Sequence, residues 1–275
     1  MRIALLQMTS GIDPAANAAT VVDAAAHAAA GGAKMLFTPE MTGLLDRKRD
    51  RALAHLTGET DDRVLEAVSA AAARHGLWIA LGSLALAGET SDGRLVNRSL
   101  LVGPDGVVRA RYDKMHLFDV DLATGESWRE SAAYAPGETA VVADGPEGWR
   151  LGLSVCYDLR FPALYQALSG AGANLLTIPA AFTVPTGEAH WHVLMRARAI
   201  ENAAYVVASA QTGTHEDGRA TFGHSLVVGP WGDVLLDMGN APGVGFADLD
   251  LAQVADARAR VPVIRHRRSI GAVSS

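Results

Sequence analysis

In the stretch Leu151-Gly-Leu-Ser-Val-Cys156-Tyr-Asp-Leu-Arg-Phe-Pro162, an apolar strand gives way to polar residues and then to a helix-starting proline. A strand that turns abruptly into a helix would hold Cys156 at the strand's carboxyl end. Ligand sites in open α/β sheets gather at that edge, and the dipole of the following helix favours a thiolate. A single cysteine in a buried strand is also typical of a small apolar filler, so both interpretations of Cys156 stay open here.

The segments on either side of this turn alternate between strand-like and helix-like patterns, which is typical of an α/β domain. Asp13-Pro14 and Gly31-Gly32 bound an alanine-rich helix, and Gly76 is suited to end a helix over 61–75. Pro104-Asp105-Gly106 predicts a hairpin turn. We expect further helices after Pro162 and over about 188–202, a polar loop over 119–138, and strands at 3–7, 35–37, 78–86, 99–102, 107–112, 150–155, 174–178, 205–210, 225–228, 234–236 and 244–247.

Composition excludes several classes of protein. With 275 residues, 49% of them apolar, the chain can bury a large core, so it is not disordered as a whole. A net charge of −6 argues against binding to a nucleic-acid backbone. One cysteine allows neither an intramolecular disulfide nor a two-cysteine metal or redox motif, and it fits a reducing compartment such as the cytoplasm.

The chain shows no internal repeat or linker, so we expect a single domain over residues 1–275 with a C-terminal tail from about 261. The apolar run at the N-terminus is too short for a signal peptide. Residues 161–187 carry no charge, but prolines and glycines interrupt them, so we expect no membrane span. Four basic residues at 265–268 are typical of a solvated or subunit-bridging segment rather than a nucleic-acid patch.

Two further residues stand at the ends of predicted strands, as Cys156 does. Glu40 follows a strand and Thr-Pro, and Lys114 ends the second strand of the hairpin. Either residue alone would be typical of a solvated charge. Together, a thiol, a carboxylate and an amine form a chemically complete set for nucleophilic catalysis.

The segments around these residues make the sequence similar to a known family. They are Phe37-Thr-Pro-Glu40, Tyr112-Asp-Lys-Met-His-Leu117 and Leu153-Ser-Val-Cys-Tyr-Asp-Leu-Arg-Phe161, and further matches lie at 186–191, 196–201, 222–225 and 230–232. Glu40 and Lys114 are 74 positions apart, and Lys114 and Cys156 are 42 apart. Over nearly its whole length the chain resembles the carbon–nitrogen hydrolases of the nitrilase superfamily. It is most similar to the Nit branch, in particular the deaminated glutathione amidases, and somewhat less to the ω-amidases.

The resemblance implies a four-layer αββα sandwich of the nitrilase-like type, usually dimerised through helices, and a cofactor-free amidase. It implies that Cys156 is the nucleophile and Glu40 the general base. Lys114 would stabilise the oxyanion, together with the backbone N–H of Tyr157. It favours deaminated glutathione as substrate, cleaved to 2-oxoglutarate and cysteinylglycine. The alternative is an ω-amidase that releases ammonia from 2-oxoglutaramate or 2-oxosuccinamate.

Two more residues, Glu130 and Arg160, are candidates for the same site. Glu130 matches a second glutamate that family members place beside the triad, where it would orient Lys114 or assist the hydrolytic water; it is otherwise a surface charge on a loop. A lysine between two carboxylates limits their repulsion. Arg160, four residues after Cys156, is a candidate to hold a substrate carboxylate through two hydrogen bonds. Its alternative is an ion pair with an acid such as Asp158.

Other functions stay open at this point. A papain-like Cys–His hydrolase would use His116, His190 or His224 as base, and a non-enzymatic protein would bind a keto acid as a sensor. His190 and His192 point to different helix faces, and His215 and His224 lack metal-ligand spacing, so we expect no metal. The expected partners are a small-molecule amide and further copies of the chain, in a homodimer or larger homo-oligomer, but neither nucleic acid nor a membrane.

Overall fold

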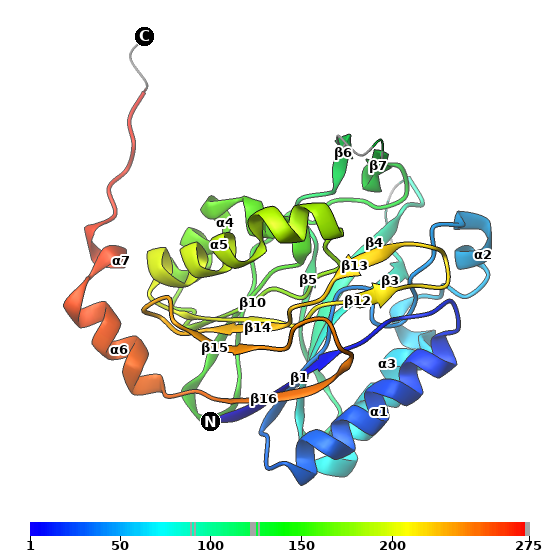
Figure 1. Cartoon of the computed structure of the whole chain (residues 1–275), viewed down its shortest axis with the longest axis horizontal. Coiled ribbons are helices and arrows are strands. Elements are labelled where there is room, and N and C mark those ends of the chain that lie inside the picture. Colours follow the sequence, from blue (N-terminus) through cyan, green and yellow to red (C-terminus); the bar gives the residue numbers. More distant parts are fainter. Residues whose placement is uncertain (89, 91, 122–124, 126, 273–275) are drawn as a thin grey trace.

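The protein is a sandwich of two sheets with helices on both outer faces (Figure 1). The computed structural model describes residues 1–88, 90, 92–121, 125 and 127–272. Within these residues the two main sheets have six strands each. This arrangement confirms the predicted four-layer αββα architecture.

The first sheet has the strand order β16-β1-β2-β3-β4-β5. Strands β1, β2 and β3 are parallel, and β4 and β5 continue the sheet antiparallel to their neighbours. Two helices, α1 (Pro14–Ala30) and α3 (Arg63–His75), pack alanine, valine and leucine side chains on its outer face. The strands are β1 (Arg2–Gln7), β2 (Met35–Phe37), β3 (Trp78–Ala87), β4 (Leu95–Val102), β5 (Val108–Asp113) and β16 (Gly243–Asp248).

Both helices end as the sequence predicts, because their caps are local. The Asp13 side chain accepts a hydrogen bond from Ala15 N at the start of α1. Gly76 adopts the left-handed conformation, with φ 60°, after the last turn of α3.

The second sheet has the strand order β15-β14-β11-β10-β9-β8. Strands β9, β10 and β11 are parallel, so their carboxyl ends share one edge. Two helices, α4 (Pro162–Gly170) and α5 (Val184–Asn202), cover its outer face (Figure 1). The strands are β8 (Val142–Asp144), β9 (Arg150–Leu153), β10 (Leu175–Thr177), β11 (Tyr205–Ala208), β14 (Leu226–Val228) and β15 (Val234–Asp237).

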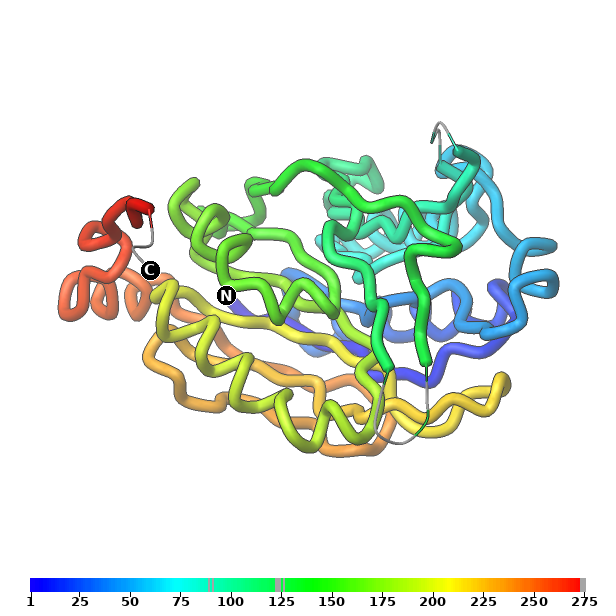
Figure 2. Tube along the Cα trace, turned by 90° about the horizontal axis from the view of Figure 1, so that it is seen from above, coloured from blue at the N-terminus to red at the C-terminus, as the bar shows by residue number. Residues whose placement is uncertain are grey.

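The smaller elements gather at the two ends of the sandwich. Figures 1 and 2 show α2 and the hairpins β6–β7 and β12–β13 at one end, and α6, α7 and the C-terminus at the other. Their bounds are α2 (Arg49–Leu53), β6 (Asp119–Asp121), β7 (Ser127–Arg129), β12 (Thr212–Thr214), β13 (Ala220–Phe222), α6 (Leu251–Arg260) and α7 (Val263–His266), with short 3₁₀ turns η1 (Glu59–Asp61), η2 (Glu130–Ala132), η3 (Pro146–Gly148) and η4 (Cys156–Arg160).

The structure differs from the sequence predictions at several elements. The segment predicted as a polar loop over 119–138 contains β6, β7 and η2, and its residues 122–124 and 126 lie outside the described part of the chain. Helix α5 begins at Val184, four residues early, because Pro185 lies in its first turn, where no N–H is needed. Strand β4 begins four residues before the predicted strand, and the sequence did not predict α2, α6, α7, β8, β12 or β13.

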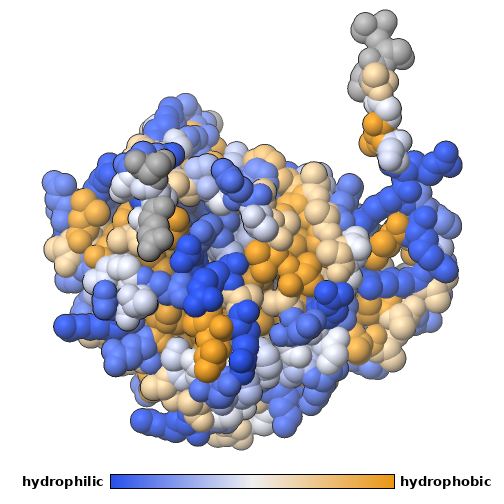
Figure 3. Space-filling view, turned by 180° about the vertical axis from the view of Figure 1, so that it is seen from behind, coloured by the Kyte–Doolittle hydropathy of each residue, from blue (hydrophilic) through white to orange (hydrophobic). Residues whose placement is uncertain are grey.

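One part of the C-terminal tail packs on the sandwich, and the part after it extends away. Arg267 donates hydrogen bonds to the ends of α4 and α5, among them 2.7 Å to Gln166 O and 2.8 Å to Asn202 Oδ1. The last described residues then run away from the sandwich (Figure 3). Residues 273–275 of the predicted tail lie outside the described part. In the part of the chain that the structure describes, no helix has the length and apolar character needed to cross a membrane.

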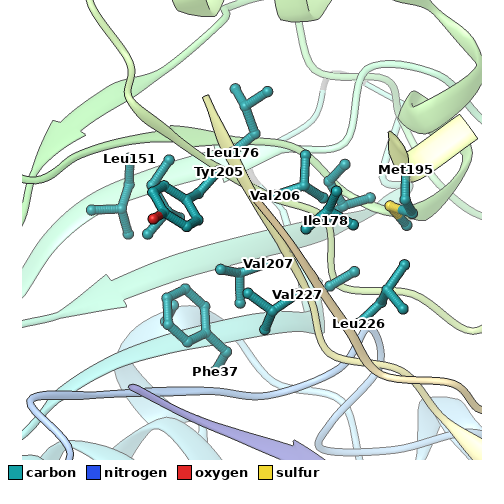
Figure 4. Close-up of a cluster of buried hydrophobic side chains, with 14 of the residues drawn as sticks. Phe37, Leu151, Leu176, Ile178, Met195, Tyr205, Val206, Val207, Leu226 and Val227 are labelled. Carbon is teal, nitrogen blue, oxygen red and sulfur yellow. The ribbon is translucent and has the colours of Figure 1, made fainter. Parts of the chain in front are cut away.

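The core between the layers follows from the alternation of side chains along the strands. Val206 and Val207 are neighbours on β11 and point to opposite faces, yet both are buried (Figure 4). Val207 lies on the side of Phe37 from the first sheet, and Val206 on the side of Met195 from α5 (Figure 4). A strand covered on both faces therefore has a continuous apolar sequence.

Candidate active site

Glu40, Lys114 and Cys156 line one pocket of about 430 Å³ at the end of the sandwich that carries α2. Glu40 follows β2, Lys114 follows β5 directly, and Cys156 follows β9. The carboxyl ends of these strands, from both sheets, meet here. The structure thus brings together three residues that lie far apart in the sequence, in a cavity of the size that small molecules occupy.

The Lys114 ammonium is buried between two carboxylates. Its Nζ donates to Glu40 Oε1 at 2.8 Å and to both oxygens of Glu130, at 3.0 and 2.8 Å. The side chains of Lys114, Glu40 and Glu130 are 2%, 6% and 12% exposed. Glu130 is therefore part of this cluster and not a surface charge on a loop.

Asn97 on β4 was missed as a site residue and holds both glutamates. Its Nδ2 donates to Glu40 Oε1 at 3.0 Å and to Glu130 Oε1 at 3.2 Å. Its backbone oxygen accepts a hydrogen bond from Lys114 N, which fixes the start of the lysine. These contacts join positions 33 and 57 residues apart, so no local sequence pattern could have revealed them.

Cys156 is held at a sharp turn. It is a non-glycine residue with φ 50°, a left-handed conformation that persists only when the surroundings impose it. Its N–H donates to Pro179 O at 2.8 Å. The constraint fixes the thiol in the pocket that Glu40 and Lys114 also line.

The thiol is protonated at rest, against the thiolate that the dipole of a following helix would favour. Burial raises the pKa of Cys156 well above its ordinary value, and the Glu40 charge raises it further, against a smaller effect of Lys114. The element that follows is the short 3₁₀ turn η4 and not an α-helix, so it offers no helix dipole of the expected strength. Cys156 therefore needs a base to become a nucleophile.

The two charged partners are held in their ionised forms. Burial alone would raise the pKa of Glu40, but the Lys114 charge and hydrogen bonds from Cys156, Lys114 and Asn97 lower it below its ordinary value. Burial would likewise lower the pKa of Lys114, but Glu130 and Glu40 raise it well above its ordinary value. The resting site pairs a neutral thiol with an ionised carboxylate, which is the state that a general base requires.

Asp158 ties the cysteine turn to β5. This fully buried carboxylate accepts hydrogen bonds from Tyr112 Oη at 2.7 Å, Val155 N at 2.8 Å and His116 N at 3.0 Å. Since Tyr112 lies two residues before Lys114, the contact aligns the lysine with the nucleophile across the two sheets. Asp158 is thus occupied by these donors and is not an ion-pair partner of Arg160.

Arg160 lies at the wall of the pocket. It contacts His190 Nδ1 at 3.2 Å, and its guanidinium lies 5.5 Å from the ring centre of Phe182. None of its contacts in the described residues is an ion pair, so its charge is open to a ligand. Tyr157 lies in the first turn of η4, where N–H groups have no acceptor within the helix.

Glycine is required where β3 passes beneath Glu40. A Cβ at Gly82 would lie 2.1 Å from Thr38 O and 2.3 Å from Pro39 O. Gly82 N also donates to the Thr38 hydroxyl at 2.9 Å. This close approach seats the Thr38-Pro39-Glu40 segment on the sheet and sets the position of the carboxylate.

The histidines that a Cys–His scheme would need are engaged by other groups. His116 Nδ1 lies 2.7 Å from Asp158 and its ring stacks on Phe161, and His190 contacts Arg160. His224 Nδ1 lies 2.8 Å from Asp237. Glu40 lines the pocket with Cys156, whereas His116, His190 and His224 do not.

One cluster in the described residues has the spacing of metal ligands. Donor atoms of His192, His224 and Asp237 lie within 4.8 Å of one another. Sequence spacing missed it because the three residues come from separate elements. The two histidines already hydrogen-bond the Asp237 carboxylate, and none of the three lines the pocket.

Comparison with known proteins agrees with this geometry. The Carbon-nitrogen hydrolase family model matches residues 2–259. The chain is 39% identical to a deaminated glutathione amidase of Yersinia enterocolitica, over 98% of this chain and 94% of the relative.

Two solved structures are similar as well. The NitFhit protein of Caenorhabditis elegans has a TM-score of 0.88 and 39% identity; the match covers 97% of this chain but only 65% of that longer one. An amidase of Nesterenkonia sp. AN1, solved as a glutamate-to-glutamine variant with acrylamide added at its active-site cysteine, has a TM-score of 0.79 and 31% identity. That match covers 95% of this chain and 98% of the other. The chain belongs to the carbon–nitrogen hydrolase family, within the nitrilase superfamily, and is a hydrolase of carbon–nitrogen bonds in linear amides.

Proposed function

We propose that the protein hydrolyses deaminated glutathione to 2-oxoglutarate and cysteinylglycine, with Cys156 as nucleophile. The observation that carries the chemistry is that one buried pocket holds the protonated Cys156 thiol, the ionised Glu40 carboxylate and the Lys114 ammonium paired with that carboxylate. The substrate is favoured by the similarity to deaminated glutathione amidases and by a pocket that combines this cluster with arginines.

In the first half of the reaction, Glu40 takes the proton of the thiol as the sulfur attacks the amide carbon. The carbonyl oxygen becomes an oxyanion, which Lys114 and the N–H of Tyr157 stabilise; one such donor contributes about 10²–10³ in turnover. The carbon–nitrogen bond then breaks. Glu40 returns its proton to the departing amine, leaving a 2-oxoglutaryl thioester on Cys156.

In the second half, water hydrolyses the thioester. Glu40 accepts a proton from the water and the hydroxyl adds to the acyl carbon. The carbon–sulfur bond then breaks, and Glu40 returns that proton to the sulfur, which restores the thiol and the ionised carboxylate. Glu130 keeps the Lys114 ammonium in place throughout, since it binds that group with both oxygens. Without Glu130, the Lys114 ammonium would keep Glu40 as its one carboxylate partner among the described residues, and its position would be less fixed.

Arg160 binds the carboxylate next to the 2-oxo group. It ends the turn that Cys156 begins, so its guanidinium and the nucleophile enter the pocket from one short element. A planar guanidinium can hold a carboxylate through two parallel hydrogen bonds, which lysine cannot do. We expect Arg160→Lys to raise KM for carboxylate-bearing amides.

The substrate is tested by comparing kcat/KM for deaminated glutathione and for 2-oxoglutaramate on the purified protein. We expect the larger amide to be preferred. A strong preference for 2-oxoglutaramate would identify an ω-amidase and overturn the substrate, while leaving the chemistry of Cys156 in place.

The catalytic set is tested separately. Glu40→Gln should abolish turnover of both amides, whereas His116→Ala and His224→Ala should retain it. The reverse result would favour a Cys–His hydrolase.

We also propose that the protein acts in the cytoplasm as a homodimer. Val193 and Ile200, seven residues apart on one face of α5, are exposed, and so are Trp231, Val234 and Leu235 in and before β15. An apolar surface of this kind is typical of an interface between subunits. Sedimentation velocity should show a dimer that Val193→Asp dissociates; a monomeric wild type would contradict it.

A further inference from the structure

Two arginines of the pocket wall, Arg47 and Arg219, lie against the indole ring of Trp128 on β7. The guanidinium of Arg219 lies 4.6 Å from the centre of a Trp128 ring, and that of Arg47 lies 4.8 Å from it. All three residues line the same pocket as Cys156. The guanidinium of Arg219 places a positive charge on the indole at this wall.

This wall also has two buried donors without a partner among the described residues, Arg219 Nε and Trp128 Nε1. A buried donor without an acceptor costs free energy, and such groups in a native protein call for an explanation. Both atoms are closed to solvent, so an anion in the pocket would reach Arg219 through the part of its side chain that stays exposed.

Asp217 pairs with Arg219 at a long distance and leaves its guanidinium without a side-chain hydrogen bond to an acid among the described residues. Asp217 Oδ2 lies 3.5 Å from Arg219 Nη2, which is beyond a normal hydrogen bond. The oxygens of Asp217 instead accept from Arg47 N at 2.8 Å and Arg219 N at 2.9 Å. The Arg219 side chain is only 16% exposed, so water screens its charge poorly.

The electrostatic environment of Arg219 agrees with this geometry. Burial lowers the pKa of Arg219, and the neighbouring charge of Arg47 lowers it further, against the opposing effect of Asp217. A second anion beside Arg219 would relieve both effects.

We propose that Arg219, held against Trp128, binds the carboxylate of the departing cysteinylglycine. This inference rests on the proposed function, because deaminated glutathione carries a carboxylate on each side of the amide that is cleaved. Arg160, next to the nucleophile, takes the one on the acyl side, and Arg219 takes the other. A simple ω-amide has no such second carboxylate, so Arg219 selects the larger substrate.

The test compares two substrates that differ in one charge: deaminated glutathione and the same molecule with its glycine carboxylate converted to a primary amide. A charge-assisted hydrogen-bonded contact corresponds to about 10-fold to 100-fold in binding. We expect the wild type to prefer the free acid in kcat/KM by about that factor, chiefly through KM. Arg219→Gln should reduce the preference to near one, and Arg219→Lys should keep part of it.

Arg129→Gln is the matched control. Arg129 is the neighbour of Trp128 and also lines the pocket, but Asp121 already binds its guanidinium with two contacts of 2.9 Å. This variant should keep the wild-type preference. Thermal unfolding of each variant shows whether the fold is intact.

The outcomes separate the inference from the proposed function. A wild type that cleaves both substrates equally, or an Arg219→Gln variant that keeps the full preference, overturns the role of Arg219 alone. A wild type that cleaves 2-oxoglutaramate but neither of the two larger amides overturns the proposed substrate, and the role of Arg219 with it. The wild-type preference requires no variant, so misfolding of Arg219→Gln does not prevent the test.

Discussion

The ammonium of Lys114 lies 2.8 Å from Glu40 Oε1, although the two residues are 74 positions apart and follow different strands of the first sheet. The pair is buried, and Glu130 binds the same ammonium from a second side. A buried charge is stable only with its partners, so the catalytic geometry and the stability of this region depend on the same contacts.

Removing the lysine should therefore affect both properties. Lys114→Met leaves two buried carboxylates without a cation, and we expect the free energy of unfolding to fall by roughly 3–5 kcal/mol. Turnover should fall at least about 10²–10³-fold through loss of the oxyanion donor. Urea unfolding followed by circular dichroism, with steady-state kinetics, measures the two effects.

An exposed cation provides the control for Lys114. Arg109→Met removes an ion pair on the surface of the β4–β5 hairpin, where such pairs contribute about 0–1 kcal/mol. If Lys114→Met were as stable as this variant, the burial argument would be wrong.

Asn97 acts as a positioning residue, and its test is a pH profile. Asn97→Leu removes the hydrogen bonds to Glu40 and Glu130, so kcat should fall about 10-fold to 100-fold with little change in KM. Because the Asn97 contact lowers the pKa of Glu40, its loss should move the acidic limb of kcat to higher pH.

Asn202→Ala is the matched structural change. Asn202 is buried and hydrogen-bonded to Ser169 and Arg198, but it does not line the pocket. This variant should lose stability and keep the wild-type pH profile. An unchanged acidic limb in Asn97→Leu would exclude the positioning role.

The pKa directions define a pH window for activity and stability. Glu40 has a pKa below its ordinary 4.5, so its stabilising effect is present above pH 4.5 and is lost as the pH falls through the lowered value. Cys156 has a pKa well above its ordinary 9.0. Its contribution to the free energy of unfolding is therefore present below pH 9.0 and is lost as the pH rises beyond it. Lys114, raised from 10.5, also loses its effect on the alkaline side.

We accordingly expect kcat/KM to be level between about pH 5 and pH 9, within the range set by these groups. Initial rates in overlapping buffers at constant ionic strength measure the profile. A single ionisation near pH 6.5 would indicate a histidine base and contradict the role of Glu40.

A substitution at Gly82 tests whether the close packing beneath Glu40 sets the position of its carboxylate. Gly82→Ala forces a methyl group against Thr38 and Pro39, so the free energy of unfolding should fall by roughly 1–3 kcal/mol. The shift of the Glu40 segment should lower kcat as well. Chemical denaturation and kinetics on the same preparation measure both.

Gly58→Ala serves as the comparison. Gly58 has φ −68°, and an added Cβ there would meet no atom within 4 Å. It should change neither stability by more than about 0.5 kcal/mol nor activity. Equal effects of the two alanines would show that the contact under Glu40 is unimportant.

Local chemistry explains which elements the sequence predicted well. Asp13, Gly31 and Gly76 act on the backbone within a few residues, so the ends of α1 and α3 were predicted to within two residues. The short hairpin β6–β7 is polar and mostly exposed, so no apolar alternation marks it. Helix α6 has few buried residues and gives a weak helical pattern.

The site residues also fall into those that local sequence indicates and those that only long-range packing brings to the pocket. Glu40, Lys114 and Cys156 each stand at the end of a strand, and that position, with the family resemblance, was enough to select them. Asn97 and Arg219 contribute through contacts with residues many positions away. Only the packing of β4 beside β5, and of the segment before β13 on β7, brings them to the pocket.

The central claim is that the amide carbon becomes bonded to the sulfur of Cys156. It is tested most directly by mixing the protein with excess deaminated glutathione, quenching in acid within the first turnovers and mapping the adduct by mass spectrometry. The account predicts a 2-oxoglutaryl thioester on Cys156 in the wild type, and neither adduct nor turnover in Cys156→Ala. Turnover that persists in Cys156→Ala, or an acyl group found on another residue, would contradict it.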